Sequence, residues 1–295
     1  MKALASTVIV ILALILAQGP AMGCASQPSQ GQSMGPQEPR EPQERKSCVL
    51  PATLGTPERI AVEAPRDAEL HEYWAVPDSP EWWAPAPDDA ERVAYREALL
   101  LRLGAAANLE PRALLRRQRA VHAVIPGDGA REAENSDALL SGQVGTIAPA
   151  SCLEWRLFQR QARRFPMLER PTEFAAYILR GQGELHIYLS GADRVGGRLS
   201  GEVRARVIAD VARGFEPVAH LHNHPFMFDR QVGDRTWATP ATLADIAGAL
   251  APSMSDVQLY RGMVEEFGLR GAWVTNGLDS AHFPWAAFDR LAGWP

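Results

Sequence analysis

Apolar residues recur at helical or strand spacing along most of the chain, and changes of period divide it into elements. Apolar positions three and four residues apart predict helices over residues 88–103, 111–124, 151–170 and 200–215. Short stretches of branched and aromatic residues predict strands over residues 173–181, 184–191 and 218–226. Residues 125–137 are polar and rich in turn-forming residues and predict a loop or a domain boundary. Residues 257–277 predict a helix or mixed segment and a closing strand without further chemistry. The expected fold is α/β (α+β), with a central mixed sheet flanked by helices and a mainly helical region before it.

The composition is that of a globular protein without a nucleic-acid partner. The chain has 295 residues, of which 46% are hydrophobic, which suffices for one or two domains with a core. Its formal net charge is -5, and it lacks a long basic run. The locally basic residues 112–119 are interpreted as the solvated face of a helix.

The first residues resemble an export signal. One Lys precedes an apolar run that is too short to span a bilayer, and small residues lead to Cys24. Residues 21–24 resemble a bacterial lipobox, which implies a lipid-modified Cys24 and a chain anchored to the cell envelope, in the periplasm or at the outer membrane. An ordinary cleaved signal is the alternative. Residues 25–47 are rich in Gln, Pro, Ser and Gly and predict a disordered tether.

The remaining chain is divided into a mainly helical region, residues 48–150, and a domain, residues 151–295. With Cys24 lipidated, Cys48 and Cys152 are left to form a disulfide outside the cytoplasm, and two unpaired buried thiols are the alternative.

Three tryptophans lie close together in the predicted helical region. The sequence leaves open whether they line a surface for a peptide or glycan or anchor loops to a core, and packing is the favoured interpretation. They are Trp74, Trp82 and Trp83.

The stretch HLHNHPF, residues 220–226, holds three of the seven histidines at alternating positions. Alternate residues of a strand share a face, so His222 and His224 can converge on one ion, and Pro225 ends the strand beside them. Such a pair predicts zinc, which needs a further ligand and, for catalysis, an open position. His220 is assigned to the core or to orienting a ligand.

A carboxylate follows in TWATPATLAD. Thr239 and Pro240 predict a helix start, which places Thr242 and Asp245 on one face of the first turn. Asp245 is therefore the predicted oxygen ligand. The alternative is that Thr242 and Asp245 form a capping box.

Together these segments resemble the JAMM/MPN (JAB) family of zinc metallopeptidases. The family pattern is a Glu at the start of a strand after a helix, then His-x-His-Pro at a strand end, then Ser-x-x-Asp at a helix start. The matching residues are Glu173, His222, His224, Thr242 and Asp245. The resemblance covers about residues 152–277 and implies a JAMM-like metallopeptidase domain.

Three features depart from the family pattern. The loop between Pro225 and Thr242 is longer, and Thr242 replaces the family's Ser, which stiffens the side chain. One more residue separates Glu173 from Gly181, which predicts a bulge in that strand. Glu184 is the alternative to Glu173.

The resemblance implies a mechanism. His222, His224 and Asp245 hold zinc and leave a position for water, and Glu173 takes up the proton of that water and passes it to the leaving amine. Thr242 stabilises the oxyanion together with the metal.

The expected function is zinc-dependent hydrolysis of peptide or isopeptide bonds at the cell envelope, with a peptide or protein substrate and cell-wall peptides as one candidate. A non-catalytic module of the same fold, which binds a partner through the Trp-rich region, is the second hypothesis. A different metallohydrolase is the third, and an HNH-type nuclease is disfavoured because the chain lacks a basic face. The remaining histidines are expected to be structural: His71, His122, His186 and His282.

Overall fold

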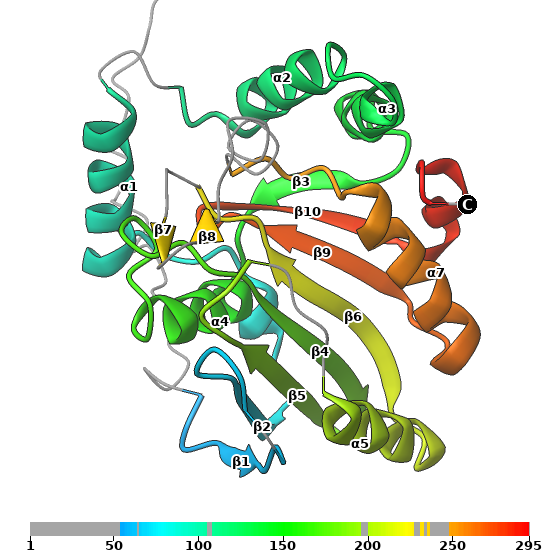
Figure 1. Cartoon of the computed structure of the whole chain (residues 1–295). Helices are drawn as coiled ribbons and strands as arrows, with labels where there is room; N and C mark the ends of the chain where they lie inside the picture. Colours follow the sequence, from blue (N-terminus) through cyan, green and yellow to red (C-terminus); the bar gives the residue numbers. More distant parts are fainter. Residues whose placement is uncertain are drawn as a thin grey trace, which may run out of the picture. The chain divides into compact units, whose positions relative to one another are not determined.

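One mixed sheet of eight strands runs through the described part of the chain (Figure 1), in the order β1-β2-β5-β4-β6-β9-β10-β3. Its strands are β1 Glu58–Ile60, β2 Leu70–Pro77, β3 Thr146–Pro149, β4 Phe174–Gly181, β5 Glu184–Gly191, β6 Glu216–Asn223, β9 Gly271–Thr275 and β10 Asp279–Pro284. The β6–β9 pair is parallel, and the other pairs are antiparallel. A separate hairpin consists of β7 Gln231–Val232 and β8 Arg235–Thr236.

The fold is given by a computed structural model. It describes residues 54–63, 65–104, 108–195, 200–226, 231–232, 235–236 and 248–294. All of these residues belong to one unit that extends over Arg45–Pro295. Within these ranges, no helix combines the length and the apolar character that crossing a bilayer requires.

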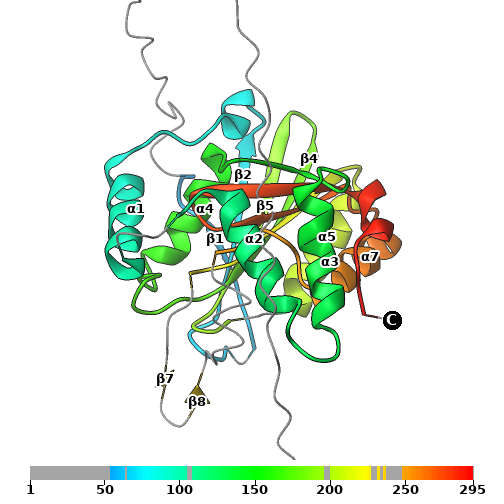
Figure 2. The ribbon, with the colours of Figure 1, turned by 90° about the horizontal axis from the view of Figure 1, so that it is seen from above.

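Helices cover both faces of the sheet. They are α1 Ala90–Leu103, α2 Pro111–His122, α3 Gly129–Leu140, α4 Cys152–Ala162, α5 Gly201–Ala212 and α7 Met254–Phe267, with the 3-10 turns η1 Pro80–Trp83 and η2 Trp285–Arg290. In both views α1 and α7 lie on opposite sides of the described unit (Figures 1 and 2). The α/β expectation is thus confirmed.

Alternation along β4 divides the core between the two faces of the sheet. Tyr177 packs in one cluster with Val207 of α5 and Val257 of α7. The next residue, Ile178, packs in a second cluster with Leu157 of α4. Successive strand residues point to opposite faces, so one face, the α5–α7 side, is covered by those two helices and the other by α4.

Side-chain caps start the helices where the sequence predicted them. The Asp89 carboxylate accepts from the Arg92 N–H at α1, and Ser200 caps α5. Ser151 and Glu154 form a capping box at α4. Each cap satisfies backbone donors that have no partner inside the helix. The predicted strands 173–181 and 184–191 are present as β4 and β5. The register of β4 with β6 shifts between Ile178 and Leu179, but the extra residue is Val218 of β6, so the bulge is not in the strand where it was expected.

The loop expected over residues 125–137 is wrong, because α3 begins at Gly129 and packs against α2. Two of its polar residues, Asn135 and Ser136, are buried, and Asn135 forms hydrogen bonds to distant segments. Asn135 donates to the carbonyls of Pro252 (3.1 Å) and Ala292 (3.0 Å). A polar buried face removes the apolar periodicity by which a sequence reveals a helix.

The expected boundary at residue 150 does not separate two structural units. Strands β1, β2 and β3 all come from residues 48–150, yet β2 pairs with β5 and β3 pairs with β10. Pairing between distant segments is a tertiary property that local periodicity does not encode.

The tryptophans support packing rather than an exposed surface. Trp74 and Trp82 are only 4% and 2% exposed, and their indole N–H groups donate to the carbonyls of Gly55 (3.3 Å) and Pro77 (3.0 Å). Trp83 packs edge-on against Trp273. The Trp-rich region therefore offers little surface to the partner that the non-catalytic hypothesis requires.

The expected signal, the tether, Cys24 and Cys48 all precede the described residues. Cys152 is 1% exposed and is disulfide-bonded. Its partner lies outside the described ranges, so the Cys48–Cys152 pairing stays a prediction.

Candidate metal centre

The end of β6 brings two imidazoles together. His222 is the penultimate residue of β6, and His224 follows the strand directly, where its N–H donates to the Thr275 carbonyl (2.8 Å) and so continues the alignment with β9. Both histidines are 7% exposed, and their Nε2 atoms lie 3.1 Å apart. The alternation in HLHNHPF thus places this pair as the sequence predicted.

A carboxylate from α7 completes a group of three. Asp256 Oδ2 lies 3.5 Å from the Nε2 of both His222 and His224. Asp256 is held by a capping box with Ser253, whose N–H (2.8 Å) and hydroxyl (2.7 Å) both donate to Oδ2. The cap that starts α7 therefore also fixes the direction of the carboxylate.

The three facing atoms have the spacing of a zinc site. Bonds of about 2.0–2.1 Å in a tetrahedron separate neighbouring ligand atoms by about 3.3–3.4 Å. The observed separations are 3.1, 3.5 and 3.5 Å. A single point can therefore lie about 2 Å from all three atoms, with the fourth tetrahedral position open. Among the described residues, these three meet the geometric requirement for holding a metal ion.

The Nδ1 atoms of His222 and His224 both contact polar groups outside the centre. Each Nε2 is thereby directed at the point where a metal ion would lie. His224 Nδ1 lies 2.9 Å from the Ala249 carbonyl and donates to it, so Nε2 is the unprotonated atom when the ring is neutral, as it would be once a metal ion takes the place of the second proton. His222 Nδ1 lies 3.3 Å from the hydroxyl of the fully buried Tyr260. Such contacts orient histidine ligands in metal sites.

The electrostatics of the group favour bound positive charge. Burial alone would raise the pKa of Asp256, but the charges and hydrogen bonds of His222 and His224 hold it well below its usual range. Burial would lower the pKa of His224, whereas the hydrogen bond and charge of Asp256 and the charge of Glu173 raise it to about 9. The carboxylate is thus ionised and attracts a proton or a metal ion to the imidazoles.

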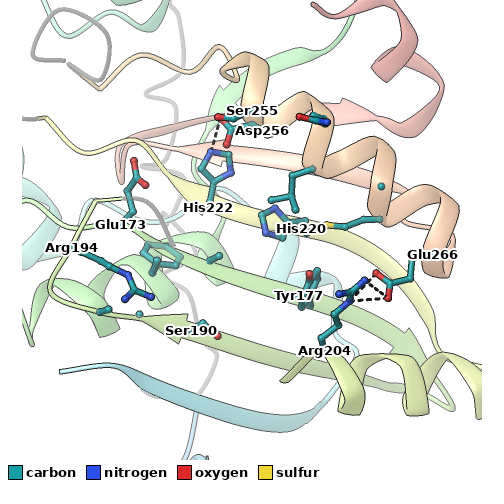
Figure 3. Close-up of a pocket in the computed structure, with 18 of the residues that line it drawn as sticks. Glu173, Tyr177, Ser190, Arg194, Arg204, His220, His222, Ser255, Asp256 and Glu266 are labelled. Atoms are coloured by element: carbon teal, nitrogen blue, oxygen red, sulfur yellow. Dashed lines mark hydrogen bonds and ion pairs between the residues drawn. The ribbon is translucent and has the colours of Figure 1, made fainter. Parts of the chain in front are cut away.

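Glu173 lies at the edge of this centre. It immediately precedes β4, whose Ala175 pairs with His222 across the sheet. Its side chain lines the same cavity as His222 and Asp256 and points, like His222, toward the start of α7 (Figure 3). The alternative, Glu184, begins β5 at the opposite end of the sheet, about 20 Å away at about 3.3 Å per residue. Of these two glutamates, only Glu173 is therefore close enough to the two histidines to act as the general base.

Among the described residues, the carboxylate that meets the two imidazoles is one that the sequence analysis did not indicate. It is Asp256, in the stretch PSMSD, which carries an unmodified Ser-x-x-Asp from Ser253 to Asp256, and that motif is the signal in the sequence that indicates it. Thr242 and Asp245 lie outside the described residues, so their roles stay predictions.

The expectation that residues 257–277 carry no chemistry is wrong, because Tyr260 contacts His222. His220 lies one alternation before His222, is 3% exposed and contacts the rings of Tyr177, His222 and Tyr260. Burial first, and then the charge of His222, lower the pKa of His220 to about 3, so it is neutral. It supports the centre by packing.

The other histidines have partners elsewhere. His71 lies 2.6 Å from the Ser190 hydroxyl, His186 lies 2.5 Å from Asp210, and His282 lies 2.9 Å from Glu154. His122 is buried at the end of α2.

Comparisons of the chain with family models, with curated proteins and with solved structures return no match.

Proposed function

We propose that the chain is a zinc-dependent hydrolase of peptide or isopeptide bonds, JAMM-like in its site, with His222, His224 and Asp256 as metal ligands and Glu173 as general base. The observation that carries the proposal is the triangle of His222 Nε2, His224 Nε2 and Asp256 Oδ2. Two neutral imidazoles and a carboxylate with an open fourth position are the ligand set of catalytic rather than structural zinc.

Each neighbouring residue has a distinct task in this proposal. A bound zinc ion would acidify a water molecule and polarise the substrate carbonyl. Glu173 accepts the proton of the attacking water and returns it to the nitrogen of the leaving amine. Ser255 also lines the cavity, but its hydroxyl lies 2.9 Å from that of Ser253 and donates to it, because the Ser253 proton is directed at Asp256 Oδ2. The bound metal ion would therefore be the group that stabilises the developing oxyanion.

Ser253 has a positioning role. Its hydroxyl and its N–H are both directed to Asp256 Oδ2, and its hydroxyl accepts from the Asp256 N–H (3.2 Å). Ser253 and Asp256, with His-x-His-Pro before them, match the order and residue types of the family pattern more closely than Thr242 and Asp245 do. We propose that the protein acts at the cell envelope, because residues 1–24 resemble an export signal.

Glu173→Gln separates catalysis from metal binding. The purified protein and the variant are loaded with zinc, their metal content is measured, and both are incubated with a proteome-derived peptide library whose products are read by mass spectrometry. We expect about one zinc ion in both proteins and at least about 100-fold slower cleavage by the variant, which lacks the general base.

Glu184→Gln serves as the matched control, because it changes the same residue type at the far end of the sheet. It should leave both the zinc content and the cleavage rate unchanged. A wild-type protein that binds no zinc, or a Glu173→Gln variant as active as the wild type, would refute the proposal.

A further inference from the structure

A cleft of about 1040 Å³ extends from the metal centre along the α5–α7 side of the sheet. Figure 3 shows Glu173, His222 and Asp256 at one end of it and the pair Arg204 and Glu266 at the other. Strands β4, β5 and β6 form the floor, and one face of α7 forms a wall. We call this space the α7 cleft.

The floor changes character along the cleft. At the register of His222 it consists of small residues, since Ala175 pairs with both His222 and Ser190. One alternation farther from the metal it becomes aromatic, since Tyr177 pairs with His220. The small floor residues leave room beside the metal centre, where a peptide main chain has to approach the ligands.

An ion pair between α5 and α7 closes the end of the α7 cleft that is farther from the metal centre. Arg204 of α5 binds Glu266 of α7 through Nε (2.7 and 3.0 Å to the two carboxylate oxygens) and Nη2 (2.6 Å). A bidentate pair of this kind has a defined geometry and ties α5 to α7. The cleft thus has a limited length.

The cleft carries an excess of negative charge. Its lining includes five carboxylates and two arginines, namely Glu69, Glu173, Asp256, Glu265, Glu266, Arg194 and Arg204. Arg194 and Arg204 each pair with a glutamate, at 3.5 Å and 2.6 Å. A divalent metal ion at the centre would offset the negative charges of Glu173 and Asp256. The exposed Glu265, which forms no ion pair with a described residue, is the one lining carboxylate without a compensating cation.

The position of Glu265 sets a length. It follows Asp256 on α7 by nine residues, or two and a half turns, so the two side chains leave opposite sides of the helix. A rise of about 13 Å along the axis and an offset of about 10 Å across it separate them by about 17 Å. An extended peptide spans that distance in about five residues.

Resting on the proposed function, we propose that the α7 cleft binds the substrate as an extended peptide bearing a primary ammonium group about five residues from the scissile bond, recognised by Glu265. A lysine-type side chain and a free N-terminal amine supply the same chemistry.

Binding to the zinc-loaded Glu173→Gln protein tests this without turnover. The probes are fluorescein-labelled alanine-rich hexapeptides with one lysine at each position in turn, the same peptides with acetyl-lysine, and a lysine-free peptide with a free N-terminus. Because Glu265 is exposed, fluorescence polarisation should show about twofold to fivefold tighter binding of ammonium-bearing peptides, and the comparison identifies which amine is recognised. Adding Glu265→Gln should abolish the preference, whereas Glu97→Gln on α1 should preserve it.

Gly262→Phe tests the cleft itself. Gly262 lines the cleft on α7, and a Cβ there meets nothing within 4 Å, so the aromatic ring fills the cleft without disturbing the core. The variant should keep its zinc and its melting temperature and bind every hexapeptide at least about tenfold more weakly. Gly201→Phe is the matched control, since a Cβ at Gly201 also meets nothing and Gly201 does not line the cleft.

Equal binding of amine and acetylated peptides, no peptide binding at all, or unchanged binding by Gly262→Phe would overturn this inference. Zinc content and library cleavage by the wild type are measured separately and decide the proposed function.

Discussion

Asp256 Oδ2 lies 3.5 Å from His224 Nε2, which joins the first turn of α7 to the end of β6. The start of α7 and the end of β6 are distant in the chain, but they face each other across the metal centre. Because Ser253 also directs two donors at the same oxygen, the carboxylate is positioned before any ion binds. This preorganisation is what the predictions below test.

Asp256→Asn should abolish high-affinity zinc binding. The amide keeps the shape of the side chain and an acceptor for the capping box, but it lacks the charge that attracts the metal. We expect zinc affinity, measured by competition with a chelator, to fall by more than about 100-fold. This is a larger loss than the one caused by removing a residue that only contacts a metal ligand.

Asp245→Asn is the informative control for that experiment. It changes the carboxylate that the sequence first indicated and should leave zinc affinity within about twofold of the wild type. If Asp245→Asn lowered the zinc affinity and Asp256→Asn did not, Asp245 would be the metal ligand.

Tyr260→Phe should weaken zinc binding while the fold persists. The change removes only the hydroxyl that lies 3.3 Å from His222 Nδ1, and the buried ring remains in place. Loss of such an outer contact reduces metal affinity by about 10-fold to 100-fold. A chelator competition measures this. Unchanged affinity would show that packing alone orients His222.

Ser253→Ala should affect both stability and metal affinity. Losing an N-cap costs about 1 kcal/mol of unfolding free energy, and here it also frees Asp256 from one of its donors. Ser200→Ala removes the corresponding cap of α5 and should cost similar stability without changing zinc affinity. Denaturant unfolding and chelator competition on both variants separate the two effects. An equal loss of zinc affinity in both variants would show that Ser253 acts only through stability.

The strands and the histidine pair were predictable because their rules are local. Alternation and the following Pro225 placed His222 and His224 on one face at a strand end, and the same reasoning located β4 and β5. Glu173 was indicated by the family resemblance, and its position before β4, lining the same cavity as His222, agrees with that prediction. None of these inferences required knowledge of how distant segments meet.

The carboxylate ligand could not be chosen in this way. Thr242 with Asp245 and Ser253 with Asp256 both have a hydroxyl residue three positions before an aspartate, with a nearby Pro, so both satisfy the local rule for a helix start. Which of them faces the histidines depends on the path of the chain after Pro225. The pairing of β2 with β5 and the burial of Asn135 depend on tertiary contacts in the same way.

A buried network away from the metal centre predicts pH-dependent stability. Burial alone would raise the pKa of Asp210, but hydrogen bonds from Tyr188, His186 and Arg213 lower it. Because the folded pKa is below the unfolded value of about 3.9, Asp210 contributes its full stabilisation above about pH 5 and loses it as the pH falls through the folded pKa.

Asp210→Asn should therefore cost about 3 kcal/mol of unfolding free energy at pH 7, since it leaves buried partners uncompensated. The difference between wild type and variant should shrink as the pH is lowered from 5 to 3. Urea unfolding at several pH values measures it. A difference that is constant over this range would show that the charge of Asp210 does not contribute.

The most direct test of the account is anomalous diffraction at the zinc absorption edge from crystals of the protein grown with zinc. The account predicts one strong peak within about 2.3 Å of His222 Nε2, His224 Nε2 and Asp256 Oδ2, with the Glu173 carboxylate one water molecule away. The absence of a peak there, or a peak coordinated by Asp245 with Asp256 turned away, would contradict it.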